Sequence, residues 1–202
     1  MKSKMETNTK LAFEMGYKLS LLSTYFSAIS DQRISEDRIP QTINYVKKEL
    51  KSLAIYYKAL FGNPMTEYPP LQNQGDITRV LADFYDHTET SIHVYHSGEV
   101  EAAFKLGGLL ALSEMAPPAK ENVDAVLKGI QEWLIEMGLN PKKLGNVIRK
   151  LASVDDKERG EAREKIVELV LGKKRTSFIV RNLKGLELEI GIPSGVKIVK
   201  KW

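Results

Sequence analysis

The chain contains no cysteine and only three histidines among its 202 residues. The lack of cysteine excludes disulfide bonds, thiolate metal sites and a cysteine nucleophile. No run of about 18 uncharged apolar residues occurs, so no transmembrane helix is expected. Charged residues interrupt the segment after Met1, which is therefore not typical of a signal peptide, and we expect a cytoplasmic location.

Motifs of common enzymes are also missing. The sequence has no glycine-rich phosphate loop, no HExxH pair and no GxSxG elbow. It therefore favours a non-catalytic helical interaction or adaptor protein, which docks a protein partner or associates with itself and needs no cofactor. Abundant lysine and glutamate with little glutamine favours a thermophilic origin.

Helical periodicity dominates the chain as far as about residue 171. Apolar residues that recur every three or four positions predict seven helices, over about 7–30, 40–61, 76–95, 98–115, 121–137, 141–152 and 155–171. The alternation of Leu186, Leu188 and Ile190 with polar residues instead predicts a half-buried strand. We predict a mainly α fold, a bundle or array of six to seven helices with a small C-terminal antiparallel β meander.

The pair Pro117-Pro118 is the best candidate for a domain boundary, because proline ends the preceding helix. Residues 1–118 carry twelve basic and fourteen acidic side chains, whereas residues 119–202 carry eighteen and twelve. We predict an N-terminal helical bundle over 1–118 and a helical subdomain with the meander over 119–202, or one continuous domain. The basic second half suggests an anionic partner.

Several local signals predict how helices begin, end and meet. Asp76 is expected to cap the helix that follows it, and Asn140-Pro141 to open another. Gly107-Gly108 inside an apolar helix indicates a bend or a close approach of another backbone. The connection over residues 65–75 is interpreted first as a packed crossover and second as a binding loop.

A nucleic-acid-binding protein is the first alternative. The predicted helix over 141–152 carries four basic side chains and no acid, and a basic run follows the last predicted helix. Such clusters neutralise phosphates in a salt-sensitive way. The candidate residues are Lys142, Lys143, Arg149, Lys150, Lys173, Lys174 and Arg175.

A metal-dependent enzyme is the second alternative. Projected on a helix, Asp86, Glu89, His93 and His96 fall on one face, opposite the apolar stripe. Carboxylates and imidazoles three or four residues apart converge in the way that a divalent metal ion requires. A solvated polar face explains the same pattern, since such a face normally lies opposite a buried stripe.

Overall fold

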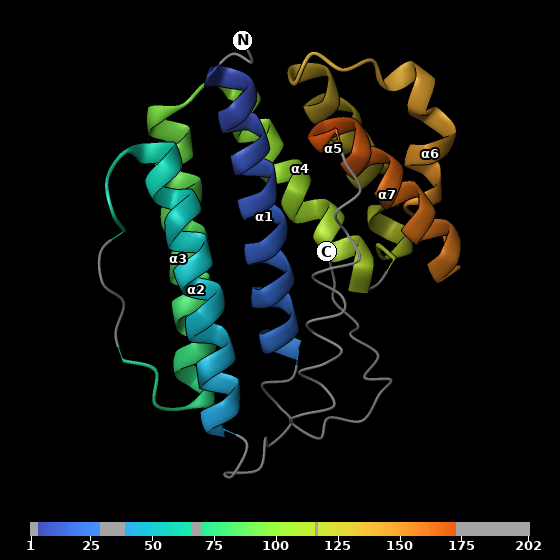
Figure 1. The fold of residues 1–202 in the computed structure, drawn as a ribbon. Helices are drawn as coiled ribbons and strands as arrows, with labels where there is room; N and C mark the ends of the chain where they lie inside the picture. The colour runs from blue at the N-terminus through green and yellow to red at the C-terminus, as the bar shows by residue number, and fades with distance from the viewer. Residues whose placement is uncertain (1–3, 29–38, 66–69, 116, 173–202) are drawn as a thin grey trace.

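The computed structural model describes residues 4–28, 39–65, 70–115 and 117–172, and these are mainly helical (Figure 1). The helices are α1 (Lys4–Ala28), α2 (Ile39–Phe61), α3 (Gln74–Tyr95), α4 (Gly98–Met115), α5 (Val123–Glu136), α6 (Gly145–Lys150) and α7 (Asp156–Leu171), with two short 3-10 helices, η2 (Lys120–Asn122) and η3 (Pro141–Leu144). The mainly α prediction is confirmed. The predicted β meander lies outside the described residues.

Helices α1 to α4 form a bundle whose interior is filled by apolar side chains (Figure 1). Tyr57 of α2 contacts His87 of α3, and Leu60 contacts His96 nine residues further along, so α2 and α3 run in the same direction. The chain must therefore return along the bundle between them. Leu71, near the end of this connection, is buried. Because residues 66–69 of this connection lie outside the described residues, the packed crossover stays a prediction.

Helices α1 and α4 approach each other backbone to backbone. A Cβ atom on Gly16 would lie 2.0 Å from the carbonyl oxygen of Phe104, and one on Gly107 would lie 2.2 Å from that of Phe13. Gly108 faces the hydroxyl of Ser20. The close approach predicted at Gly107-Gly108 is thus confirmed, and it brings apolar side chains of both helices into the core.

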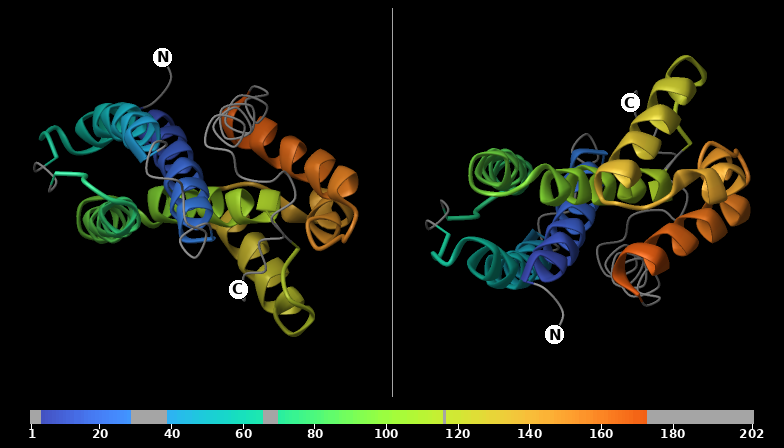
Figure 2. Two further views of the ribbon diagram at one scale, coloured as in Figure 1. Left: turned by 90° about the horizontal axis from the view of Figure 1, so that it is seen from below. Right: turned by 90° about the horizontal axis from the view of Figure 1, so that it is seen from above.

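Helix α4 is the centre of the molecule, because α1, α3, α5 and α7 all pack against it, with α1 and α7 on the side opposite α5 (Figure 2). The side chain of Arg159 on α7 is buried and holds this junction. Its Nε donates to the carbonyl oxygen of Ser113 near the end of α4, and Nη1 donates to that of Ser153. Helix α4 of the predicted N-terminal domain therefore contacts helices of the predicted second domain, and the division at Pro117-Pro118 stays a prediction.

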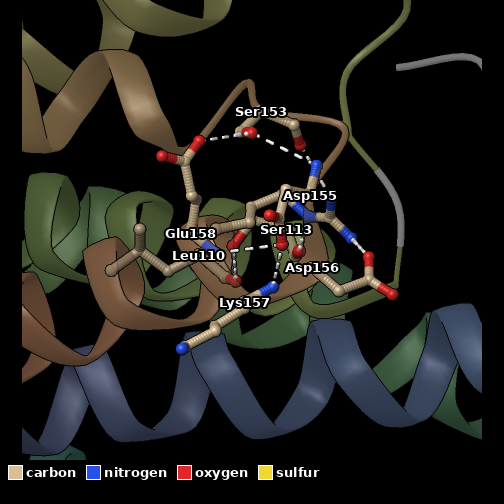
Figure 3. Close-up of polar contacts among 8 residues, drawn as sticks. Leu110, Ser113, Ser153, Asp155, Asp156, Lys157 and Glu158 are labelled. Carbon is tan, nitrogen blue, oxygen red and sulfur yellow. Dashed lines mark hydrogen bonds and ion pairs between the residues drawn. The ribbon is translucent and has the colours of Figure 1, made fainter.

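Two of the predicted helices differ in detail from the expectations, and a third has a distinctive N-terminus. The N-cap of α3 is Asn73, not Asp76, because the two residues form a reciprocal capping box in which Asp76 stands at the third helical position. Asp155 caps α7, but Glu158 accepts from the hydroxyl of Ser153 instead of returning to the Asp155 backbone (Figure 3). The helix expected over 141–152 is divided into η3 and α6.

Within the described part of the chain, no helix combines the length and apolar character needed to cross a membrane.

Candidate functional site

The three histidines contact two neighbouring helices, His93 the helix α4 and His87 and His96 the helix α2. His93 Nδ1 lies 3.0 Å from Oε2 of Glu101 on α4, and 72% of the His93 side chain is exposed. His96 Nε2 lies 3.1 Å from the carbonyl oxygen of Leu60 on α2, with its ring edge-on to Phe61. The two imidazoles therefore point toward neighbouring helices and do not converge.

The remaining members of the predicted metal set, Asp86 and Glu89, lie on the outer part of α3. Among the residues that the structure describes, no three histidine or carboxylate side chains are placed to hold a metal ion together. The nearby Glu101 has another role, because hydrogen bonds from Lys105 and then His93 hold its pKa below the ordinary value. Metal binding by the predicted set stays a prediction.

The third imidazole, of His87, supports the contact between α2 and α3. Its Nε2 lies 2.9 Å from the hydroxyl of Tyr57, which also lies 3.3 Å from Oγ of Ser91. The two rings stack with centroids 5.6 Å apart. Because the Tyr57 side chain is buried, its hydroxyl needs these hydrogen-bond partners. The contact with Tyr57 therefore gives His87 a structural role between α2 and α3.

The predicted basic residues of the second half are exposed where the structure describes them. Lys142, Lys143, Arg149 and Lys150 all face solvent, while Ile148 and Leu151 are buried. Nζ of Lys150 lies 3.6 Å from Oε1 of Glu158, and this ion pair partly neutralises the charge of Lys150. Lys173, Lys174 and Arg175 lie outside the described residues.

The positive charge of the second half is concentrated near its end. Residues 119–172 carry ten basic and ten acidic side chains, whereas residues 173–202 carry eight basic and two acidic. The described helices α5 to α7 therefore have no excess of positive charge. The residues that gave the second half its basic character are those of its last segment.

A stronger basic surface lies on α2, in the half with a negative balance. Its outward face contains only exposed residues within an arc of about 100°, and they are Pro40, Asn44, Lys47, Lys48, Lys51, Ile55 and Lys58. We call the four lysines the lysine face. None of them forms an ion pair with another described residue.

The only acid of α2 points the other way. Glu49 is buried between α1 and α2, where its Oε2 lies 2.5 Å from Nζ of Lys18. The same ammonium donates to Oγ of Ser52 at 3.1 Å. Since Lys18 compensates Glu49 inside the bundle, no carboxylate of α2 reduces the charge of the lysine face.

The apolar side of α2 packs into the interior of the bundle. Its buried positions include Ile43, Val46, Leu50, Leu53, Tyr57 and Leu60. Ile55 is the one large apolar side chain of the outward face, and 69% of it is exposed. The exposed apolar residues of α2 are Ile55 and the small Pro40 and Ala59, so its outward face is mainly charged.

Sequence reasoning missed the lysine face, although a signal was present. A helical projection of residues 39–61 places the four lysines on one side and Glu49 on the opposite side. Counting charges by halves of the chain hid this arrangement, because acids elsewhere in residues 1–118 cancel the lysines in the sum.

A second unusual group is buried where α1, α4 and α7 meet. Nε of Arg163 lies 3.4 Å from Oε1 of Glu114, whose side chain is only 5% exposed. Neither the Glu114 oxygens nor the hydroxyl of Tyr17 has a hydrogen-bond partner in the described part of the chain. Burial raises the pKa of Glu114, and Arg163 partly opposes that rise.

Comparison of the chain with protein-family models, with curated proteins and with solved structures gave no match.

Proposed function

We propose that the protein is a non-catalytic interaction protein that binds an anionic partner through the lysine face of α2. The observation that carries this proposal is the exposure of four lysines within one arc of α2, while its only acid is buried against Lys18. Like charges at this spacing repel one another slightly. An anionic partner removes that repulsion, so the arrangement gains free energy when it is occupied.

The position of α2 supports this choice. It lies on the opposite side of the molecule from α6, so that the two basic surfaces are separate (Figures 1 and 2). A partner on α2 would leave α5 to α7 accessible, as an adaptor requires. The bundle also fixes the helix before binding, which lowers the entropic cost of association.

Two variants of equal net charge test the proposal. In the first, the lysine face is neutralised as K47Q/K48Q/K51Q/K58Q. In the matched control, four exposed lysines of other helices are neutralised as K120Q/K128Q/K157Q/K165Q. The measurement is the salt concentration at which each protein elutes from immobilised heparin, a generic polyanion. We expect the lysine-face variant to elute distinctly earlier than the control. Equal elution of the two variants would refute the proposal.

Nucleic-acid binding through the second half is a second candidate function. It is supported by the exposure of Lys142, Lys143 and Arg149, with no acid between residues 141 and 150. The test replaces Lys142, Lys143, Arg149 and Lys150 by alanine and follows the mobility shift of a duplex over a salt series. Unchanged binding by this variant would dispose of the second candidate.

A further inference from the structure

The shape of the lysine face limits the kind of partner it suits. Lys47 and Lys58 are eleven residues apart, which places them about 17 Å apart along the helix axis. A duplex presents about ten phosphate charges over that length. A straight, convex row of ammonium groups therefore matches a partner whose charges are also arranged in a dense row.

An acidic protein surface fits this face less well. Stable protein interfaces contain a desolvated core of aromatic and apolar side chains, and their core is depleted of charge. The outward face of α2 offers only Ile55 and the small Pro40 for such a core. Lysine is also depleted in protein interfaces relative to the remaining surface.

An anionic membrane fits less well for a related reason. A helix that binds at a lipid surface inserts its apolar side and keeps its cations at the headgroups. The apolar side of α2 is packed against α1 and α3, and its members are buried. A membrane could then contribute only surface electrostatics, at about 1 kcal/mol per lysine.

We infer that the lysine face binds the phosphate backbone of a nucleic acid without reading its sequence. This inference rests on the proposed function and specifies its partner. Ammonium groups bind phosphates as point charges, whereas sequence is read mainly by bidentate side chains such as arginine and asparagine. The outward face of α2 has no arginine, and it holds a single asparagine, Asn44.

The neighbouring helix sets the direction in which the backbone lies. Asp83 and Asp86 are exposed on α3. They repel a polyanion that extends across from α2 onto α3, and the backbone therefore lies along α2. Four contacts of this kind give a salt slope, d log K / d log [salt], of about −3.6 for a duplex.

The test uses the full chain and a labelled duplex of about 20 base pairs, over a salt series from about 50 mM to about 200 mM. We expect K47Q/K48Q/K51Q/K58Q to flatten the salt slope by about 3.6, so that the roughly 150-fold loss of affinity that four contacts cause between the lowest and the highest salt is absent from this variant. The matched control K120Q/K128Q/K157Q/K165Q keeps the wild-type slope. Duplexes rich in A·T and in G·C bind within about threefold of each other, since no base edge is read.

Other outcomes overturn the inference and separate it from the proposed function. An equal loss of affinity in both variants means that net charge alone governs binding. Wild-type affinity in the lysine-face variant places any nucleic-acid site elsewhere. Binding through the lysine face to polyglutamate, or to vesicles with about 30% phosphatidylserine, but not to duplex, refutes the inference and leaves the proposed function standing. If the heparin elution of the two variants also agrees, both fail.

Discussion

The carboxylate of Glu49 lies 2.5 Å from the ammonium of Lys18, in the contact between α1 and α2. The two side chains are only 10% and 17% exposed, so each charge depends on the other for compensation. The same pairing decides the character of the outer surface of α2. With its acid held inside the bundle, the helix presents only positive charge to solvent.

Replacing Glu49 by glutamine is expected to destabilise the fold by about 2 kcal/mol, because it leaves the partly buried Lys18 ammonium without a counter-charge. Urea unfolding measures the loss. The apolar double variant K18M/E49L should recover much of it, since removing both charges also removes their desolvation cost. A loss of unfolding free energy in E49Q as small as that in K47Q, at an exposed position, would contradict the role of Glu49 as the counter-charge of Lys18.

Alanine at Gly16 should destabilise the protein by about 3 kcal/mol, although alanine is normally the better helix former. The new Cβ would meet the backbone carbonyl of Phe104, so α1 and α4 would have to separate. The control is Gly145→Ala on α6, where a Cβ has nothing within 4 Å. That variant should be neutral or stabilising by about 0.5 kcal/mol in thermal unfolding. Equal effects would mean that the close approach is absent in solution.

The stability of the fold should depend on pH through Glu114. Burial raises its pKa above the ordinary 4.5, so between that value and the raised one the folded protein holds a proton that the unfolded chain has released. Stability is therefore lost as the pH rises through this window. Glu114→Gln cannot titrate, so its stability relative to wild type should increase from about pH 4 to about pH 7 in urea unfolding. The control is Glu161→Gln, at an exposed position. An identical dependence of stability on pH in both variants would argue against a buried Glu114 with a raised pKa.

His96→Ala should cost about 1 to 2 kcal/mol, because it removes the hydrogen bond to the Leu60 carbonyl and the edge-on contact with Phe61. His93→Ala should cost less than about 0.5 kcal/mol, since its imidazole is mostly exposed. Neither melting temperature should change with a chelator. A melting temperature of the wild type that falls with chelator, with equal losses in both variants, would instead support the predicted metal set.

Much of the fold could be predicted from local pattern. The seven predicted helices agree with the seven in the described residues to within a few positions, because apolar side chains that recur every three or four residues must face a common core. The left-handed Gly138 and the cap at Asn140 also follow from local chemistry. The N-cap of α3 was wrong by three residues, since Asn73 and Asp76 can each begin a helix and only their reciprocal contact distinguishes them.

The candidate site was less accessible to such reasoning. Helical projection placed Asp86, Glu89, His93 and His96 on one face, away from the apolar stripe of α3. In the structure Asp86 and His93 are exposed, whereas Glu89 and His96 are half-buried. Projection could not show that His93 turns toward α4 and His96 toward α2. Those contacts depend on helices that lie next to α3 only after folding. The lysine face likewise follows from helical projection, whereas the burial and pairing of Glu49 depend on Lys18, a residue of another helix.

The sequence by itself determined which segments are helical, where most of them stop, and that a glycine pair in α4 needs a close neighbour. These properties depend on side-chain periodicity and on backbone freedom, which act within a few residues. Only the tertiary structure decided that α1 is this neighbour, that α2 and α3 run in the same direction, and that α2 shows solvent lysines without an acid. Those outcomes depend on which surfaces bury each other, and residues far apart in the chain settle that together.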